Sequence, residues 1–164
     1  AKPTIDTKDA DRVSSRLGMS REVGFLVGAD ENIREHFAAH RADVGEVACL
    51  LLDEAPSLTP PQVDDLLRIA VLDGIPVLAY GIRTDFRTQA FPGSRRLLEV
   101  AHSLEELKTI CRCGRKALFN ARLVGGRFVF DGDQVAIDEL SMDTVTYESM
   151  CASCYLEESN GSMS

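Results

Sequence analysis

The stretch EVACLLLDEAPSLTPPQVDDLLRIA, residues 46–70, carries the strongest indication of the fold. Its apolar run VACLLL, residues 47–52, is too short for a buried helix and is typical of a parallel strand covered on both faces. Thr59 is a favourable N-cap for a helix that begins PPQVDDLL, because proline is tolerated in a first turn. Gly74 ends that helix, and IPVLAY, residues 75–80, predicts the next buried strand. This strand–helix–strand order predicts a right-handed unit of a parallel α/β sheet.

The rest of the chain predicts a larger α/β part followed by a smaller β part. The first twenty residues are polar and predict a loop, residues 22–28 a short strand, and residues 29–44 an amphipathic helix. Ser103 and Glu106 suit the capping box of a short helix or turn. After residue 110, glycines punctuate short alternating segments, which is typical of hairpins. We therefore predict an α/β domain at 1–109, a β domain at 110–158 and a disordered tail at 159–164.

Composition narrows the class of protein. The chain has 164 residues, of which 45% are hydrophobic, and this is enough for one α/β domain with a small appendage. A net charge of −8 argues against a general nucleic-acid or membrane surface, because phosphate contacts need an excess of Lys and Arg. We find neither a signal peptide nor an apolar run of about 20 residues, the length that spans a bilayer. The expected location is the cytoplasm.

Four of the five cysteines form two close pairs, Cys111 with Cys113 and Cys151 with Cys154. Two such pairs can supply a tetrahedron of thiolates, the arrangement of a structural zinc site. The first pair has one intervening residue where two are usual, so four ordinary buried or free thiols are the alternative. A closed four-thiolate site has no open position for a substrate, and its metal would stabilise the fold. Cys49 lies within the apolar run and is predicted to be a core residue.

Two adjacent carboxylates, Asp53 and Glu54, follow the apolar run directly. An Asp at the end of a buried parallel strand can hold Mg²⁺, usually through water, beside the phosphates of a nucleotide. A Glu directly after it points elsewhere and can accept a proton from an attacking hydroxyl. The alternative is a strand end at which two solvated acids begin a loop, and the spacing alone does not decide between them.

The segment YGIRTDFRTQAFPGSRRLL, residues 80–98, follows the next strand, where open α/β sheets place ligand-binding loops. Phe86 and Phe91 lie in this polar loop beside charged residues. Loop aromatics in this setting can wall a pocket for a planar base. The alternative is that both rings fold back onto the core.

Several motifs together resemble one family, the zinc-containing thymidine kinases shared by bacteria and the animal cytosol. They are KPTIDTKD (2–9), LLLDEA (50–55), GIPVLAYGIRTDFRTQAFPGS (74–94), LKTICRCGRKA (107–117) and YESMCASCY (147–155), and the resemblance covers residues 2–156. It implies a P-loop-type α/β domain with a small zinc "lasso" domain. It also implies transfer of the γ-phosphoryl group of ATP to the 5′-hydroxyl of thymidine in nucleotide salvage, a homotetramer, and inhibition by thymidine triphosphate.

The resemblance also implies roles for individual residues. Asp53 corresponds to the Mg²⁺-associated Asp, and Glu54 to the general base. The loop near the phosphates corresponds to Asp6, Thr7 and Lys8. The nucleoside site corresponds to Ile82, Phe86 and Phe91 and, in the lasso, to Asn120, Ala136, Ile137, Asp138 and Tyr147. The zinc ligands correspond to Cys111, Cys113, Cys151 and Cys154. The implied cofactors are structural zinc and Mg-ATP as co-substrate.

The sequence departs from the family's pattern at its start. Family members have a strand, a P-loop ending in Gly-Lys-Ser/Thr and a helix before the counterpart of KPTIDT, whereas this sequence starts at Ala1-Lys2-Pro3. We therefore expect an N-terminally truncated P-loop sheet and negligible kinase activity from these 164 residues alone. One alternative function is that of a non-catalytic remnant, and another is that of a zinc-stapled binding module.

Three smaller departures concern the predicted site. Pro56 and Ser57 stand where the family usually has Gln and an aromatic residue, which removes one wall of the expected pocket. Thr88 replaces a frequent glycine in the loop between the two phenylalanines. Lys8 stands where Arg is common, and it keeps the charge but loses the bidentate fork.

Overall fold

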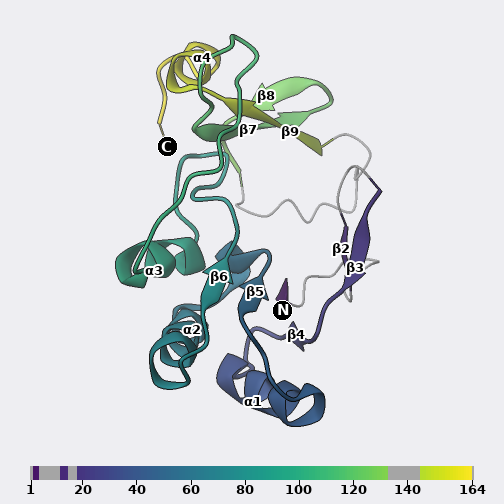
Figure 1. Cartoon of the computed structure of the whole chain (residues 1–164). Helices are drawn as coiled ribbons and strands as arrows, with labels where there is room; N and C mark the ends of the chain where they lie inside the picture. The colour runs from purple at the N-terminus through teal and green to yellow at the C-terminus, as the bar shows by residue number, and fades with distance from the viewer. Residues whose placement is uncertain (1, 4–11, 15–17, 133–144, 164) are drawn as a thin grey trace. The chain divides into compact units, whose positions relative to one another are not determined.

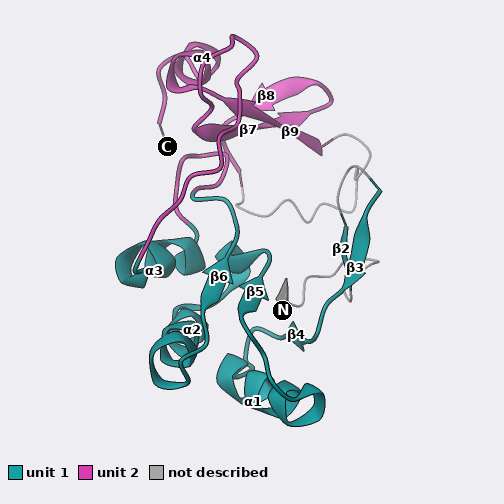
Figure 2. Ribbon diagram, viewed as in Figure 1, with its two compact units in different colours: residues 1–83, 91–102 teal, residues 84–90, 103–164 magenta. Residues whose placement is uncertain are grey.

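The computed structural model describes residues 2–3, 12–14, 18–132 and 145–163 (Figure 1). These residues fall into two compact units (Figure 2). The first consists of Ala1–Arg83 and Phe91–His102, and the second of Thr84–Ala90 and Ser103–Ser164. The second unit therefore includes a short loop taken from within the α/β part of the sequence.

The predicted strand–helix–strand unit is confirmed. Strands β5 (Leu50–Leu52) and β6 (Val77–Ala79) pair in parallel, with Leu51 opposite Leu78, and α2 (Pro60–Leu72) connects them. Thr59 is the N-cap of α2, and its backbone N–H donates to the Gln62 side chain at 3.0 Å. Gly74 follows the helix with a φ of 66°, a left-handed conformation that glycine adopts without strain.

The other elements of the first unit surround this pair. Helix α1 (Ile33–Val44) forms as predicted, with Asn32 as its N-cap. Strand β1 (Lys2–Pro3) pairs in parallel with β4 (Leu26–Val27). After β5 come the 3-10 helix η1 (Ala55–Ser57) and later α3 (Pro92–Val100). Gln62 is buried and donates to the backbone carbonyls of Gly28 and Glu31 at 2.7 and 2.9 Å, which ties α2 to the loop after β4.

Part of the first twenty residues is paired, so the prediction of a loop there is wrong in part. Strand β2 (Arg12–Ser14) is antiparallel to β3 (Ser20–Glu22). The pairing is supported by polar contacts, such as those from Arg12 to Ser20 and Glu22. Polar cross-strand pairs leave no apolar alternation in the sequence, and this explains why the hairpin was not recognised.

The core of the first unit lies on one face of β5. Its buried apolar residues are Val27, Ile33, Phe37, Leu50, Leu52, Ala55, Leu58, Val63, Leu66 and Ile69. Leu51 and Leu78 point to the opposite face and are 50% and 42% exposed, so the expectation of strands covered on both faces is wrong. Since neighbouring strand residues alternate between faces, the helices α1 and α2 bury only every second residue of the run.

Cys49 is exposed, which corrects its prediction as a core residue. Strand β5 begins only at Leu50, so Cys49 belongs to the loop that precedes the strand. The apolar run in the sequence extended the expected strand by three residues; of these, Val47 still packs against the core, whereas Cys49 does not.

The second unit is a three-stranded antiparallel sheet with one helix. The strand order is β8 (Arg127–Val129), β7 (Phe119–Val124), β9 (Val145–Met150), and α4 (Ala152–Glu158) follows β9. Gly125 and Gly126 have φ angles of 56° and 77°, as a two-residue hairpin turn between β7 and β8 requires. The predicted hairpin is confirmed. Its core includes Tyr155, which packs against the rings of Phe119 and Phe130.

The helix or turn expected at Ser103–Glu106 does not form, and residues 103–109 have neither. Leu104 and Leu107 are exposed, the latter by 76%, so no apolar face packs to stabilise a helix there. The tail at 159–164, expected to be disordered, begins with hydrogen-bonded turns. The Ser159 N–H donates to the Tyr155 carbonyl at 2.9 Å, and the Gly161 N–H donates to the Leu156 carbonyl at 2.8 Å.

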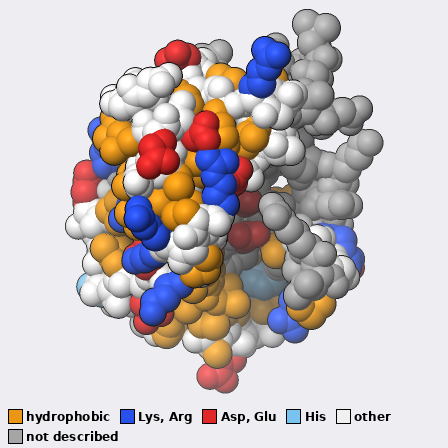
Figure 3. Space-filling model, turned by 90° about the horizontal axis from the view of Figure 1, so that it is seen from above, with side chains coloured by type: hydrophobic (Ala, Val, Ile, Leu, Met, Phe, Trp, Pro, Cys, Tyr) orange, Lys and Arg blue, Asp and Glu red, His pale blue; other side chains and the backbone are white. Residues whose placement is uncertain are grey.

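The surface of the described residues mixes charges of both signs. Figure 3 shows Lys and Arg side chains beside Asp and Glu, with apolar side chains between them. Among the helices that the structure describes, none has the length and apolarity needed to cross a membrane.

Candidate functional site

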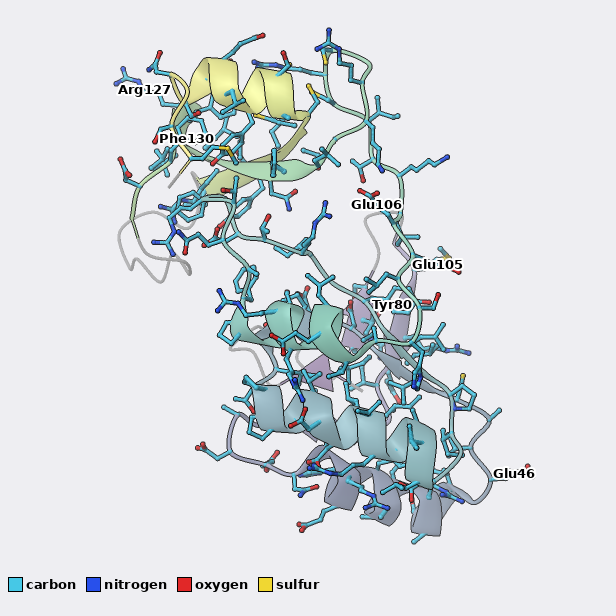
Figure 4. All side chains as sticks on the ribbon, turned by 90° about the vertical axis from the view of Figure 1, so that its left-hand side faces the viewer. Glu46, Tyr80, Glu105, Glu106, Arg127 and Phe130 are labelled. Atoms are coloured by element: carbon cyan, nitrogen blue, oxygen red, sulfur yellow. The ribbon has the colours of Figure 1, made fainter. Side chains whose placement is uncertain are left out.

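The two adjacent carboxylates lie where β5 ends. Leu52 is the last residue of the strand and is buried, Asp53 is half-buried and Glu54 is exposed. Two backbone hydrogen bonds to Tyr80 flank the pair. The Tyr80 N–H donates to the Leu52 carbonyl at 2.8 Å, and the Ala55 N–H donates to the Tyr80 carbonyl at 3.0 Å. Tyr80 follows β6 directly (Figure 4). The carboxyl ends of parallel strands are the usual place for ligands in α/β sheets.

The backbone of Glu54 is in the left-handed region, with φ 54° and ψ 34°. This conformation costs a residue with a side chain about 1–2 kcal/mol. Strain of this kind persists only where the surroundings enforce it, and it is common at functional sites. The chain then turns at once into η1, whose Ala55 is fully buried.

Ile82 and Phe91 lie in the same compact unit as the acidic pair. Ile82 is half-exposed, and its carbonyl accepts a hydrogen bond from the buried Ser94 hydroxyl at 2.9 Å. Phe91 is half-buried and is the N-cap residue of α3. Helix α3 packs against η1, so Phe91, at the start of α3, and Ile82, which is bonded to Ser94 of α3, belong to the same packed region as the turn after the acidic pair.

Phe86 belongs to the second unit and is only 2% exposed. The Tyr155 hydroxyl donates to its carbonyl at 2.7 Å, and the Arg122 guanidinium lies 3.7 Å from the centre of its ring. The sequence left two interpretations of Phe86, a wall of a base pocket or a core residue, and in this conformation its ring lies in a core. Burial, and next the nearby Asp85 carboxylate, raise the pKa of Tyr155, so its hydroxyl stays protonated and able to donate.

The loop around Phe86 is held by a buried carboxylate. Asp85 is 2% exposed, and its Oδ1 accepts hydrogen bonds from the backbone N–H groups of Arg87 and Gln89, both at 2.9 Å. Its Oδ2 pairs with the Arg87 guanidinium at 3.2 Å. These contacts close a tight turn, and Thr88 at its tip has a φ of 66°.

We expect the substitution Thr88→Gly to stabilise the protein. Glycine adopts a positive φ without strain, while a threonine there loses about 1–2 kcal/mol, and the greater entropy of unfolded glycine returns part of the gain. The net increase in the free energy of unfolding should be about 0.5–1 kcal/mol, measured by urea denaturation. Thr88→Ala is the matched control, because it removes the hydroxyl but keeps the Cβ. Equal stability of the two variants would contradict this explanation.

Asn120 and Tyr147 lie on neighbouring strands, β7 and β9. Tyr147 is opposite Arg122, and Asn120 is two residues before Arg122, so all three share one face of the sheet. Arg122 is buried, and its guanidinium donates to the Asp131 carbonyl at 2.9 Å. The sequence analysis missed Arg122, although its period-two spacing from Asn120 on a predicted strand would have placed it on this face.

The remaining predicted site residues lie outside the described residues. They are Asp6, Thr7 and Lys8, which were predicted to lie near the phosphates, and Ala136, Ile137 and Asp138, which were predicted to belong to a lasso.

The four paired cysteines converge as predicted. All four sulfurs lie within 4.8 Å of one another, and Sγ of Cys113 is 3.6 Å from Sγ of Cys151. A tetrahedral site with metal–sulfur bonds of about 2.3 Å has sulfurs about 3.8 Å apart, so the spacing fits a single ion. A tight turn shapes one side, because the Gly114 N–H donates to the Cys111 carbonyl and the Cys111 N–H to the Arg115 carbonyl, each at 2.8 Å.

The environment of these sulfurs favours thiolate on one side of the cluster. Hydrogen bonds from the backbone N–H groups of Cys113 and Cys151 lower the pKa of Cys111 to about 6. The pKa of Cys151 is also lowered, mainly by a hydrogen bond from the backbone N–H of Cys154. The pKa of Cys154 is raised to about 12, because its thiol donates to the neighbouring sulfurs. Thiolates are the form that binds metal, so these residues could hold a metal ion.

The first unit has a parallel strand–helix–strand arrangement with an acidic pair at its carboxyl end. The second unit has a small antiparallel sheet and four convergent thiols that could hold a metal ion. These features define an α/β protein. Comparison with known proteins is more specific. The family model described as thymidine kinase matches residues 1–155, and the chain belongs to this family of phosphotransferases.

Individual relatives agree with this assignment. A thymidine kinase of Chromobacterium violaceum is 43% identical over 145 residues, which are 87% of this chain and 72% of the relative. A thymidine kinase of Legionella pneumophila is 41% identical over 161 residues, 97% of this chain and 73% of the relative. A thymidine kinase of Enterobacteria phage T4 is 40% identical over 153 residues, 92% of this chain and 75% of the relative.

Proposed function

We propose that the protein is a thymidine kinase that transfers the γ-phosphoryl group of ATP to the 5′-hydroxyl of thymidine. The observation that carries this proposal is the Asp53–Glu54 pair at the carboxyl end of β5, in a chain that belongs to the thymidine kinase family. Phosphoryl transfer depends mainly on positioning and on neutralising charge, and an acidic pair at this edge can serve both needs.

The two carboxylates have separate roles in this proposal. Asp53, which is half-buried at the strand end, holds the Mg²⁺ of Mg-ATP, usually through water. Glu54 is exposed and accepts the proton of the attacking 5′-hydroxyl. The left-handed backbone at Glu54 supports this assignment, because strained conformations concentrate at functional residues.

The nucleoside site is proposed from several segments. Ile82, Phe86, Phe91, Asn120 and Tyr147 are the proposed nucleoside-binding residues from the family resemblance, and the ring of Phe86 would have to leave the core in which it lies in this conformation. The roles of Ala136, Ile137 and Asp138, and of Asp6, Thr7 and Lys8 near the phosphates, depend on the family resemblance. The same proposal includes five further properties implied by the family: a P-loop-type sheet, a lasso domain, a homotetramer, inhibition by thymidine triphosphate and a cytoplasmic location.

Zinc is the proposed ion at the four cysteines, with a structural role. Four sulfur ligands in a tetrahedral arrangement suit zinc, and a small sheet with a single short helix gains folding free energy from it.

Binding of a set of nucleosides tests the substrate class. In calorimetric titrations of the full-length protein with Mg-ATP analogue present, we expect thymidine to bind at least about tenfold more tightly than deoxycytidine or deoxyguanosine, a difference of about 1.4 kcal/mol. The preference for thymidine is worth measuring because Pro56 and Ser57 replace the Gln and the aromatic residue usual in the family. Ser57 is small and exposed, so it does not supply the usual aromatic wall of the pocket. Equal affinity for all three nucleosides would contradict thymidine as the preferred substrate.

A further inference from the structure

The turn that follows Glu54 is packed against two glycines, one on each side. A Cβ atom added to Gly81 would lie 2.1 Å from Cδ and 2.5 Å from Cγ of Pro56, so the proline ring occupies the space of a side chain there. A Cβ at Gly93 would lie 2.5 Å from the carbonyl oxygen of Leu58. It would also lie 2.8 and 2.9 Å from the carbonyl oxygens of Pro56 and Ala55. Real Cβ atoms do not approach other atoms this closely.

Close approach, and not conformational freedom, accounts for these glycines. Neither Gly81 nor Gly93 has a positive φ, so the backbone at both positions would accept any residue. Gly93 is moreover in the first turn of α3, where alanine is the better helix former. The absence of a side chain at both positions therefore serves the contact with the turn.

The contacted turn follows Glu54 directly, and Glu54 is its N-cap residue. Pro56 is buried, and Ala55 is buried completely and bonded through its N–H to the Tyr80 carbonyl. The Ser57 N–H donates to the carbonyl of Glu54 at 3.1 Å. A left-handed Glu needs such restraint from its neighbours, because the conformation is unfavourable by itself.

We propose that Pro56, Gly81 and Gly93 act as a clamp that fixes the left-handed backbone of Glu54 and so aims its carboxylate. They are positioning residues for phosphoryl transfer, since none of them needs to touch the substrate. The functional half of this inference rests on the proposed role of Glu54 as the base. Its structural half, that the clamp sets the Glu54 backbone, stands on the contacts alone.

The structural half is tested by crystal structures of three variants. In Gly81→Ala, the new Cβ displaces Pro56, and we expect the φ of Glu54 to leave the left-handed region. In the double variant Pro56→Ala/Gly81→Ala, the ring atoms that would clash are gone, and φ should return to about 54°. Pro56→Ala alone removes the ring and leaves the space at Gly81 unfilled, so we expect Glu54 to leave the left-handed region in this single variant as well. A left-handed Glu54 in Gly81→Ala would overturn the proposal.

The functional half is tested by the kinetics of the full-length protein. A misplaced base should lower kcat of Gly81→Ala by roughly 10- to 100-fold and leave KM for thymidine within about twofold. The double variant should recover most of kcat. Gly93→Ala should lose activity and should not be rescued by Pro56→Ala, because its closest contact is a backbone carbonyl. An unchanged kcat in Gly81→Ala, or a loss that the double variant does not reverse, would contradict the clamp.

The two halves fail in distinguishable ways. If Glu54 is not the base, Glu54→Gln will retain activity while the crystal structures still show the predicted change in φ. If the clamp is wrong, Glu54→Gln will be inactive and Gly81→Ala will keep both the left-handed backbone and its kcat.

Discussion

Replacing Glu54 with Gln is expected to reduce kcat for thymidine phosphorylation by about 100- to 10,000-fold, the range that a general base contributes. The amide has the size of the carboxylate but does not accept the proton of the 5′-hydroxyl. Because the left-handed backbone does not depend on the charge, the fold and the affinity for thymidine should change little. Steady-state kinetics of the full-length protein and calorimetry with thymidine measure the two quantities separately.

A matched control for this variant is Glu46→Gln. Glu46, labelled in Figure 4, is exposed in the loop before β5 and lies in the same unit as Glu54. Its replacement therefore makes the same change of charge outside the acidic pair. We expect its kcat to stay within about twofold of the unmodified protein, since exposed substitutions away from a site have small effects. A Glu54→Gln variant as active as this control would show that Glu54 is not the base.

Loss of one thiolate from the four-cysteine cluster is expected to destabilise the second unit. Cys113→Ser should abolish stoichiometric zinc binding. An ion present at about a thousand times its Kd stabilises the folded state by about 4 kcal/mol, and that contribution would disappear. Hydrogen exchange of the β7, β8 and β9 amides should accelerate strongly, while the amides of α2 should be much less affected.

Cys49→Ser is the control for this experiment. It removes a thiol of the same chain that is exposed and outside the cluster. Zinc content by atomic emission and protection of the β7 amides should match the unmodified protein. The structural role of the metal would be contradicted if Cys113→Ser bound zinc and exchanged its amides as Cys49→Ser does.

Several elements that depend on local signals were predicted from the sequence, although the capping-box signal at Ser103 and Glu106 did not give a helix or turn. The helix α2 has its N-cap at Thr59 and ends before Gly74, and the β7–β8 hairpin turns at two glycines. The four paired cysteines also follow from spacing, because a metal site of this kind constrains ligand type and separation. Capping, turn and ligand chemistry act over a few residues, and so they can be read from one chain.

Other features depend on contacts between distant segments and were missed or misjudged. The exposed face of Leu51 and the loop position of Cys49 reflect which helices cover β5, which an apolar run does not reveal. The burial of Phe86 depends on Arg122 and Tyr155, which lie far along the chain. The left-handed Glu54 depends on tertiary packing, and no residue type in DEAPS predicts it.

The most direct test of the proposed function is to follow phosphoryl transfer itself. The full-length protein is incubated with thymidine and Mg-ATP, and the products are identified by phosphorus NMR. We predict thymidine 5′-monophosphate and ADP in equal amounts, with their formation slowed at least about 100-fold in Glu54→Gln and retained in Glu46→Gln. A folded, zinc-containing protein that produced no thymidine 5′-monophosphate would contradict the kinase function and favour a non-catalytic role.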